Sequence, residues 1–138
     1  MHTIHSIRLR GPWQVQVLET NLPTMSGNRG TMNCPTSWFE AGWLGFCGKV
    51  RYIRNFGAPT GLGPEDQLWL VIEPCSGNLL LQLNGSALAP LKKDEKTCYD
   101  ISKIIKNRNQ LIIDLTGDNN HCGLTGEVRL GIRSIIKS

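Results

Sequence analysis

Two tryptophans and one polar cluster are the side chains of this sequence best suited to recognise a ligand. The tryptophans are Trp38 and Trp43, and the polar residues are Asp118, Asn119, Asn120 and His121. An indole offers a flat apolar face on which a sugar ring can stack, and carboxylate, carboxamide and imidazole groups hydrogen-bond to hydroxyls. We expect these six residues to bind a carbohydrate if their loops lie at one end of the fold. For Trp38, packing of the loop onto the sandwich is the alternative, and we favour it.

Catalysis is not predicted from the acidic residues. A retaining glycosidase needs two carboxyl groups about 5 Å apart on either side of a sugar, and only Glu73 with Asp114 or Glu127 could supply such a pair from neighbouring strands. The sequence has no nucleophile elbow, zinc-protease motif or phosphate-binding loop. We therefore predict solvated or ion-paired carboxylates and no enzyme activity.

No metal site or cofactor is predicted. His2 and His5 are close in sequence, and His121 precedes Cys122, but structural zinc sites usually combine two short ligand pairs. The side-chain oxygens of Asp118, Asn119 and Asn120 suit a calcium ion. An Asx-rich hairpin turn is the alternative, and we favour it.

The cysteines and the N-terminus indicate a reducing compartment. The five cysteines are Cys34, Cys47, Cys75, Cys98 and Cys122, with no Cys-x-x-Cys pair, and no apolar targeting segment begins the sequence. We expect five thiols in a cytoplasmic protein. Removal of a secretory leader, with two disulfides and one thiol, is the alternative.

The composition fits one globular domain covering residues 1–138. The sequence is 40% hydrophobic and 19% charged, with a formal net charge of +4. Its longest apolar run, residues 68–72, is far shorter than the roughly 20 residues of a membrane span. Nucleic acid is not an expected partner, because the basic residues are scattered along the chain. That alternative would need Arg51, Arg54, Arg129 and Arg133 to form one basic face.

A period of two residues dominates the hydrophobic pattern and predicts strands. Trp13, Val15 and Val17 alternate with glutamines, as in a strand with one buried face. Similar alternation follows at residues 50–54, 79–83, 111–115 and 128–132, while residues 68–72 are apolar at every position, which suits a strand covered on both faces. We expect Trp13 and Trp69 to lie in the core. Some seven or eight short strands favour an all-β sandwich.

The segments between these strands are predicted by their turn residues. Asn84-Gly85 marks a two-residue hairpin, and residues 90–97 are charged, as in an exposed connection. Residues 99–105 are expected to form one short helical turn, capped by Asp100 or Ser102. Residues 20–47 have no clear period and form a long irregular loop, a feature that is often functional.

Seven landmarks occur in an order that resembles a known family. They are residues 9–15 (LRGPWQV), 35–38 (PTSW), 48–56 (GKVRYIRNF), 68–73 (LWLVIE), 83–85 (LNG), 99–113 (YDIS followed by NQLII) and 123–130 (GLTGEVRL). In this order the sequence resembles the N-terminal sugar-binding jelly roll of β-galactosidase and β-glucuronidase glycoside hydrolases. The resemblance covers nearly the whole chain, although no single landmark is specific.

The resemblance implies a galactose-binding-like jelly-roll sandwich that accompanies a catalytic barrel. It therefore implies a noncatalytic carbohydrate-binding module, and a protein-interaction or structural sandwich that has lost sugar binding is the alternative. The sequence departs from the family in three segments, one of which has Asn107-Arg108-Asn109 where a Pro-Gly usually follows the helical turn. Charged residues 91–96 replace a Gly-rich loop, and His121-Cys122 stands where a tryptophan often precedes the last strand. Sugar contacts transferred from the family are therefore in doubt.

Overall fold

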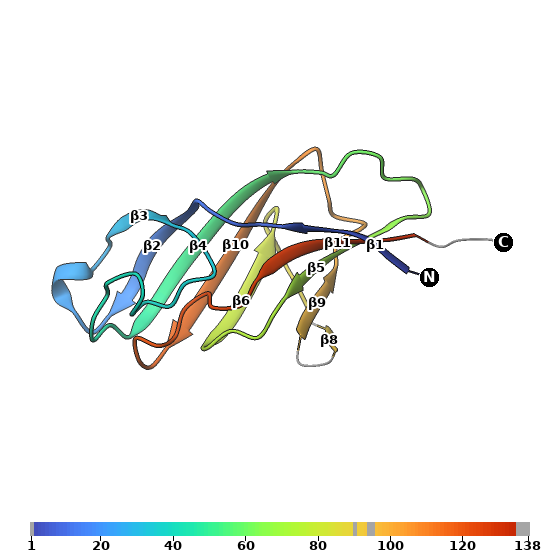
Figure 1. Cartoon of the computed structure of the whole chain (residues 1–138). Coiled ribbons are helices and arrows are strands. Elements are labelled where there is room, and N and C mark those ends of the chain that lie inside the picture. Colours follow the sequence, from blue (N-terminus) through green and yellow to red (C-terminus); the bar gives the residue numbers. More distant parts are fainter. Residues whose placement is uncertain (1, 90, 94–95, 135–138) are drawn as a thin grey trace.

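Two antiparallel sheets pack face to face in the computed structural model, which describes residues 2–89, 91–93 and 96–134 (Figure 1). In order across the five-stranded sheet lie β1 (His2–Arg8), β11 (Val128–Ser134), β5 (Gln67–Ile72), β9 (Lys96–Asp100) and β8 (Leu91–Lys93). In order across the six-stranded sheet lie β3 (Arg29–Met32), β2 (Trp13–Thr20), β4 (Gly48–Gly57), β10 (Arg108–Gly117), β6 (Asn78–Leu83) and β7 (Ser86–Ala87). The predicted all-β sandwich is confirmed.

Alternating apolar residues of both sheets form the core between them. In β2, Trp13, Val15 and Val17 are buried, while Gln14 between them is exposed. The same alternation occurs in the central strands β4 and β10, where completely buried residues are Val50, Tyr52, Leu111, Ile113 and Leu115. Each buried Val or Leu side chain contributes about 1.5–3 kcal/mol relative to exposure. The predicted alternation in these strands is confirmed.

Strand β5 is covered on one face, so the prediction of two covered faces is wrong. Leu68, Leu70 and Ile72 are buried in the core, whereas Trp69 and Val71 are half-buried on the opposite side. The expectation that Trp69 lies in the core is therefore also wrong. Continuous apolar runs do not reveal by themselves whether a second layer covers the strand.

The Asn84-Gly85 hairpin is confirmed, and its residues have φ angles of 53° and 86°. Two other predictions need correction. Residues 90–97 were expected to form an exposed connection, but β8 and the start of β9 lie within them and pair with each other. Residues 90, 94 and 95 lie outside the described part of the chain. At residues 99–105 the chain makes a hydrogen-bonded turn with Asp100 as its cap, but the 3-10 helix of the described chain is η1 (Pro23–Met25).

Two ordered elements, η1 and β3, lie within residues 20–47, which were expected to be irregular throughout. Strand β3 pairs with the first half of β2, with Trp13 opposite Met32 and Gln16 opposite Arg29. The backbone N–H of Val17 also donates to the carbonyl of Asn28 at 2.8 Å. The irregular part that remains, residues 33–47, runs along the end of the sandwich where β4 begins (Figure 1).

The four arginines of the nucleic-acid alternative do not share a face. Arg51 and Arg54 lie on β4 of the six-stranded sheet, and Arg129 and Arg133 lie on β11 of the five-stranded sheet. Because the sheets pack with their inner faces together, outward side chains of β4 and β11 point in opposite directions. The condition that the four arginines form one basic face is therefore not met.

Candidate functional site

The two loops that carry the predicted site residues meet at one end of the sandwich. Backbone N–H groups of residues 36–39 donate to carbonyls of residues 120–124: Thr36 to Leu124 at 3.0 Å, Trp38 to Cys122 at 2.9 Å and Phe39 to Asn120 at 2.7 Å. This is the end where β4 begins and β10 finishes (Figure 1). The loops thus lie side by side, as the sugar-binding hypothesis requires.

Trp38 is completely buried beneath these loops. Its indole Nε1 donates to the hydroxyl of Tyr52 at 2.9 Å, and its ring meets Phe46 edge to face at 4.7 Å. A Cβ added to Gly117 would lie only 2.7 Å from the Trp38 ring, so glycine permits this close approach. Trp38 therefore packs the loop onto the sandwich, which was the alternative for this residue, and has no open face for a sugar.

Trp43 is half-buried and lies in a groove of about 430 Å³. We call this space the Trp43 groove. Among the residues that line it are the apolar Trp43, Met25 and Ala41 and the polar Asn28, Arg29 and Thr31. The Trp43 indole packs edge to face against Phe46, and the two ring centroids are 5.2 Å apart. The groove therefore combines an aromatic wall with a polar rim.

The polar loop does not line this groove. His121 donates its backbone N–H to the side-chain oxygen of Asn119 at 2.9 Å, and the Asn119 amide donates to Asp118 at 3.0 Å. These bonds are those of an Asx turn. The exposed His121 ring instead faces Phe39, with centroids 5.5 Å apart, and Phe39 is 49% exposed. The structure thus places the six predicted residues at one end but not in one hollow.

Five polar groove residues were missed from the sequence: Asn28, Arg29, Thr31, Asn33 and Thr36. They belong to the segment around β3 that was treated as irregular. The run Ser26-Gly27-Asn28-Arg29-Gly30 is polar and flanked by glycines, but only the pairing of β3 with β2 brings it beside Trp43.

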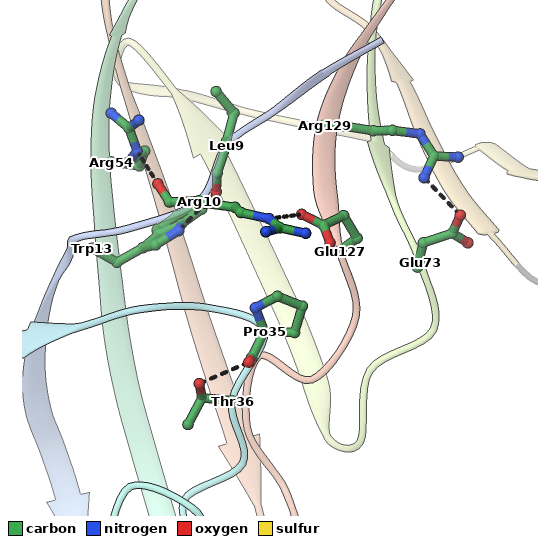
Figure 2. A network of polar contacts seen from close by, with 9 residues as sticks. All are labelled: Leu9, Arg10, Trp13, Pro35, Thr36, Arg54, Glu73, Glu127 and Arg129. Carbon is green, nitrogen blue, oxygen red and sulfur yellow. Dashed lines mark hydrogen bonds and ion pairs between the residues drawn. The ribbon is translucent and has the colours of Figure 1, made fainter.

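The carboxylates proposed for an acid pair are each engaged by a basic side chain. Glu73 accepts from Arg129 at 2.8 Å, and Glu127 lies 3.4 Å from Arg10 (Figure 2). Lys96 also lies 3.5 Å from Glu73. On the other sheet, Asp114 accepts two hydrogen bonds from Arg51 at 2.8 and 2.9 Å. These carboxylates thus serve as ion-pair partners on the sandwich surface.

Over the described ranges, no three His, Cys, Asp or Glu side chains cluster as metal ligands would. The side chains of His2 and His5 lie outside the described part. The Asp118 and Asn119 oxygens accept hydrogen bonds within an Asx turn, which is the alternative that we favoured over calcium from the sequence.

All five cysteines are free thiols. Burial raises the pKa of Cys34 from 9.0 to about 12, with a smaller contribution from Cys75. Burial also raises the pKa of Cys75, against backbone N–H groups of Gly126 and Thr125 that lower it. Both thiols are therefore neutral and unreactive at physiological pH.

No model of a known protein family matches the sequence, and no curated protein resembles it in sequence. Solved structures do share its fold. An FMN-binding β-glucuronidase of Faecalibacterium prausnitzii L2-6 superposes with a TM-score of 0.76 at 16% identity, over 94% of this chain and 22% of that chain. The β-glucuronidase of Bifidobacterium dentium gives a TM-score of 0.75 at 16% identity, over 94% and 30% of the two chains.

A putative β-galactosidase of Bacteroides fragilis is similar to the same extent, with a TM-score of 0.73 at 15% identity over 94% of this chain and 23% of that chain. The fold is therefore that of a β-sandwich domain found in glycoside hydrolases of the β-glucuronidase and β-galactosidase kind, and the resemblance drawn from the landmarks is confirmed in the fold. The chain spans between a fifth and a third of the length of these structures. Within the described residues, no helix has the length and hydrophobicity to cross a bilayer.

Proposed function

We propose that this chain is a noncatalytic carbohydrate-binding module and that the Trp43 groove is its sugar site. The observation that carries the proposal is an aromatic wall beside polar side chains in one hollow: Trp43 with Asn28, Arg29 and Thr31. The similarity to domains of glycoside hydrolases, which is a similarity of fold alone, supports an accessory role. Location in the cytoplasm remains part of the same proposal.

Each groove residue has a role in the proposed binding. The Trp43 indole stacks on the apolar face of a sugar ring, and the thioether of Met25 and the methyl of Ala41 extend this apolar wall. The amide of Asn28 and the hydroxyl of Thr31 can both donate and accept, as a sugar hydroxyl requires. Arg29 supplies donors only and is the one charged residue lining the groove.

The predicted residues that do not line the Trp43 groove have a smaller part in this proposal. Phe39 and His121 form an exposed aromatic pair at the same end, so a longer glycan that leaves the groove could reach them. Asp118 and Asn119 hold the turn that presents His121, and the Asn120 carbonyl accepts from the backbone N–H of Phe39. Trp38 takes no direct part, because its indole is buried.

The test is a glycan array followed by calorimetric titration with the best glycan. We expect a Kd between about 10 μM and 1 mM, weakened about tenfold or more by Trp43→Ala and less by Arg29→Gln. Leu44→Ala and Arg108→Gln are matched controls, because both side chains are exposed outside the groove. Failure of every glycan to bind below about 1 mM, or equal binding by Trp43→Ala, would contradict the proposal.

Protein interaction without sugar binding is the second candidate function. Two hydrophobic side chains near the groove favour it: Leu44 is 65% exposed and Phe39 is 49% exposed. Apolar side chains at this exposure gain most from burial against another protein. If a protein rather than a glycan binds this end, Leu44→Ala should weaken binding as strongly as Trp43→Ala, whereas a sugar in the groove is insensitive to Leu44.

A further inference from the structure

The outer face of the five-stranded sheet has a tryptophan at its centre. Trp69 lies on β5, which has β11 on one side and β9 on the other, so the indole is remote from both sheet edges. Outward positions of a sheet that faces water are normally polar. Trp69 and its neighbour Val71 are instead both apolar and half-buried.

Two arginines of the neighbouring strand β11 flank this tryptophan on the same face of the sheet. Gly131 of β11 is opposite Trp69, Arg129 is opposite Val71 and Arg133 is opposite Gln67. Because paired residues of antiparallel strands point to the same face, Arg129 and Arg133 share the outer face with Trp69. Gly131 presents no side chain opposite the indole. We call Trp69, Val71, Glu73, Arg129 and Arg133 the Trp69 face.

Arg129 and Arg133 make different contacts within the chain. Arg129 donates to Glu73 at 2.8 Å and is visible with it in Figure 2. The guanidinium of Arg133 lies 5.1 Å from the centroid of the Trp69 ring, a cation–π contact. No carboxylate of the described chain lies within ion-pair distance of Arg133. Its N–H donors are therefore open to an external acceptor.

Positive charge exceeds negative charge among the described residues of this sheet face. Lys96 adds a second cation beside Glu73 at 3.5 Å, and the exposed Arg8 is opposite Arg129 on β1. Asp100, opposite Trp69 on β9, is engaged by the hydroxyl and backbone N–H of Ser102. Among these described residues, Arg8, Lys96, Arg129 and Arg133 are cationic and Glu73 and Asp100 are carboxylates, both of which already accept hydrogen bonds.

We propose that the Trp69 face docks an acidic polypeptide segment of another protein, whose carboxylates pair with Arg133 and Arg129 while an apolar side chain covers Trp69. A second copy of this chain is disfavoured, since the chain carries a net charge of +4 and would bring like charges together. A nucleic-acid strand is disfavoured because its continuous phosphates would meet Glu73 and Asp100. This surface is distinct from the Trp43 groove, and neither proposal depends on the other.

The probe is a short synthetic peptide in which glutamates flank one central phenylalanine, titrated by NMR into the whole chain. We expect saturable shifts of the Trp69 indole N–H, a Kd on the order of 100 μM and weakening as salt rises to about 0.5 M. Arg133→Gln and Trp69→Leu should each weaken binding about five- to tenfold. Arg108→Gln, an exposed arginine on the other sheet, should change it less than about twofold.

Melting curves show whether each variant is folded, and Trp69→Phe keeps an aromatic ring if Trp69→Leu is unstable. The proposal is overturned if the peptide does not saturate, or if Arg133→Gln behaves like Arg108→Gln. Binding that depends on Arg133 but not on Trp69 would also overturn it, because charge alone would then account for the contact. Tighter binding of an oligothymidylate at the same residues would assign the face to nucleic acid instead.

Discussion

The four tryptophans divide between two environments that differ in how the indole N–H is bound. Trp13 and Trp38 are completely buried, and their Nε1 atoms donate to the Leu9 carbonyl and the Tyr52 hydroxyl, both at 2.9 Å. Trp43 and Trp69 are half-buried at the surface, where Trp69 has only a long 3.4 Å contact to Gln67. A buried indole needs an internal acceptor, whereas a surface indole can hydrogen-bond to water or a ligand. The first pair is structural, and the second is the pair to which our proposals assign recognition.

Tyr52 joins the buried pair into one unit, which we call the buried hub: Trp13, Trp38 and Tyr52. Its ring meets Trp13 edge to face at 6.5 Å, and its hydroxyl accepts from Trp38. Because Trp13 lies on β2, Tyr52 on β4 and Trp38 in the long loop, the hub fixes that loop against the six-stranded sheet. The Trp43 groove in turn depends on this fixed loop.

Among the changes that distinguish the buried hub from the Trp43 groove, Trp38→Ala is expected to have the largest effect on stability. Removing this buried side chain should lower the free energy of unfolding by about 3–5 kcal/mol. Trp43→Ala, at a half-buried site, should cost only about 1–2 kcal/mol. Urea denaturation measures both values. Similar losses for the two variants would contradict the division into structural and recognition tryptophans.

Alkaline pH should lower the stability of the core next. Burial raises the pKa of Cys34 to about 12 and that of Tyr99 to about 12, and it also raises the pKa of Tyr52. From about pH 9 upwards the unfolded chain releases protons that the folded chain keeps, so the free energy of unfolding falls. The expected loss is up to about 1.4 kcal/mol per pH unit for each such group.

Urea denaturation between pH 8 and about 11 measures this loss. The variant Cys34→Ala removes one of the groups and should give a shallower pH dependence than the unaltered chain, although its stability at neutral pH is lower because of the cavity. Parallel curves for the two proteins would show that Cys34 ionises alike in the folded and unfolded states.

The smallest of these effects is expected for Tyr52→Phe. This change keeps the aromatic packing but leaves the buried Trp38 N–H without its acceptor, at a cost of about 1–2 kcal/mol. Sugar binding in the groove should be retained, since the ring still supports the loop. A double-mutant cycle with Trp38→Phe isolates the hydrogen bond, and additive losses would show that the 2.9 Å contact contributes no stability.

The strands were the most predictable part of the molecule. Trp13, Val15 and Val17 alternate with polar residues, so the periodicity alone identified both the strand and its buried face. The Asn84-Gly85 turn was equally clear because both residues adopt positive φ. The β8–β9 pair was missed, since residues 91–96 are mostly charged and resemble a solvated connection.

The candidate site was predictable only in part. The sequence identified Trp43 as a surface aromatic and identified the loop at residues 118–121, and the structure places both at one end. It could not show that Met25, Asn28 and Arg29 complete the groove, because β3 brings them there through pairing with β2. It did distinguish Trp38, with packing against the fold as the interpretation, from Trp43, but it could not show the tertiary contact to the Tyr52 hydroxyl that keeps the Trp38 indole inside.

The position of β11 between β1 and β5 has a consequence for how the chain folds. Arg8 pairs with Arg129, and Leu130 pairs with Leu70, so the five-stranded sheet needs partners very distant in sequence. Closing such large loops before their contacts form slows folding. Until β11 arrives, β5 would present an unpaired edge, which is open to association with other chains. During synthesis, the five-stranded sheet is therefore the half of the molecule most in need of protection from aggregation.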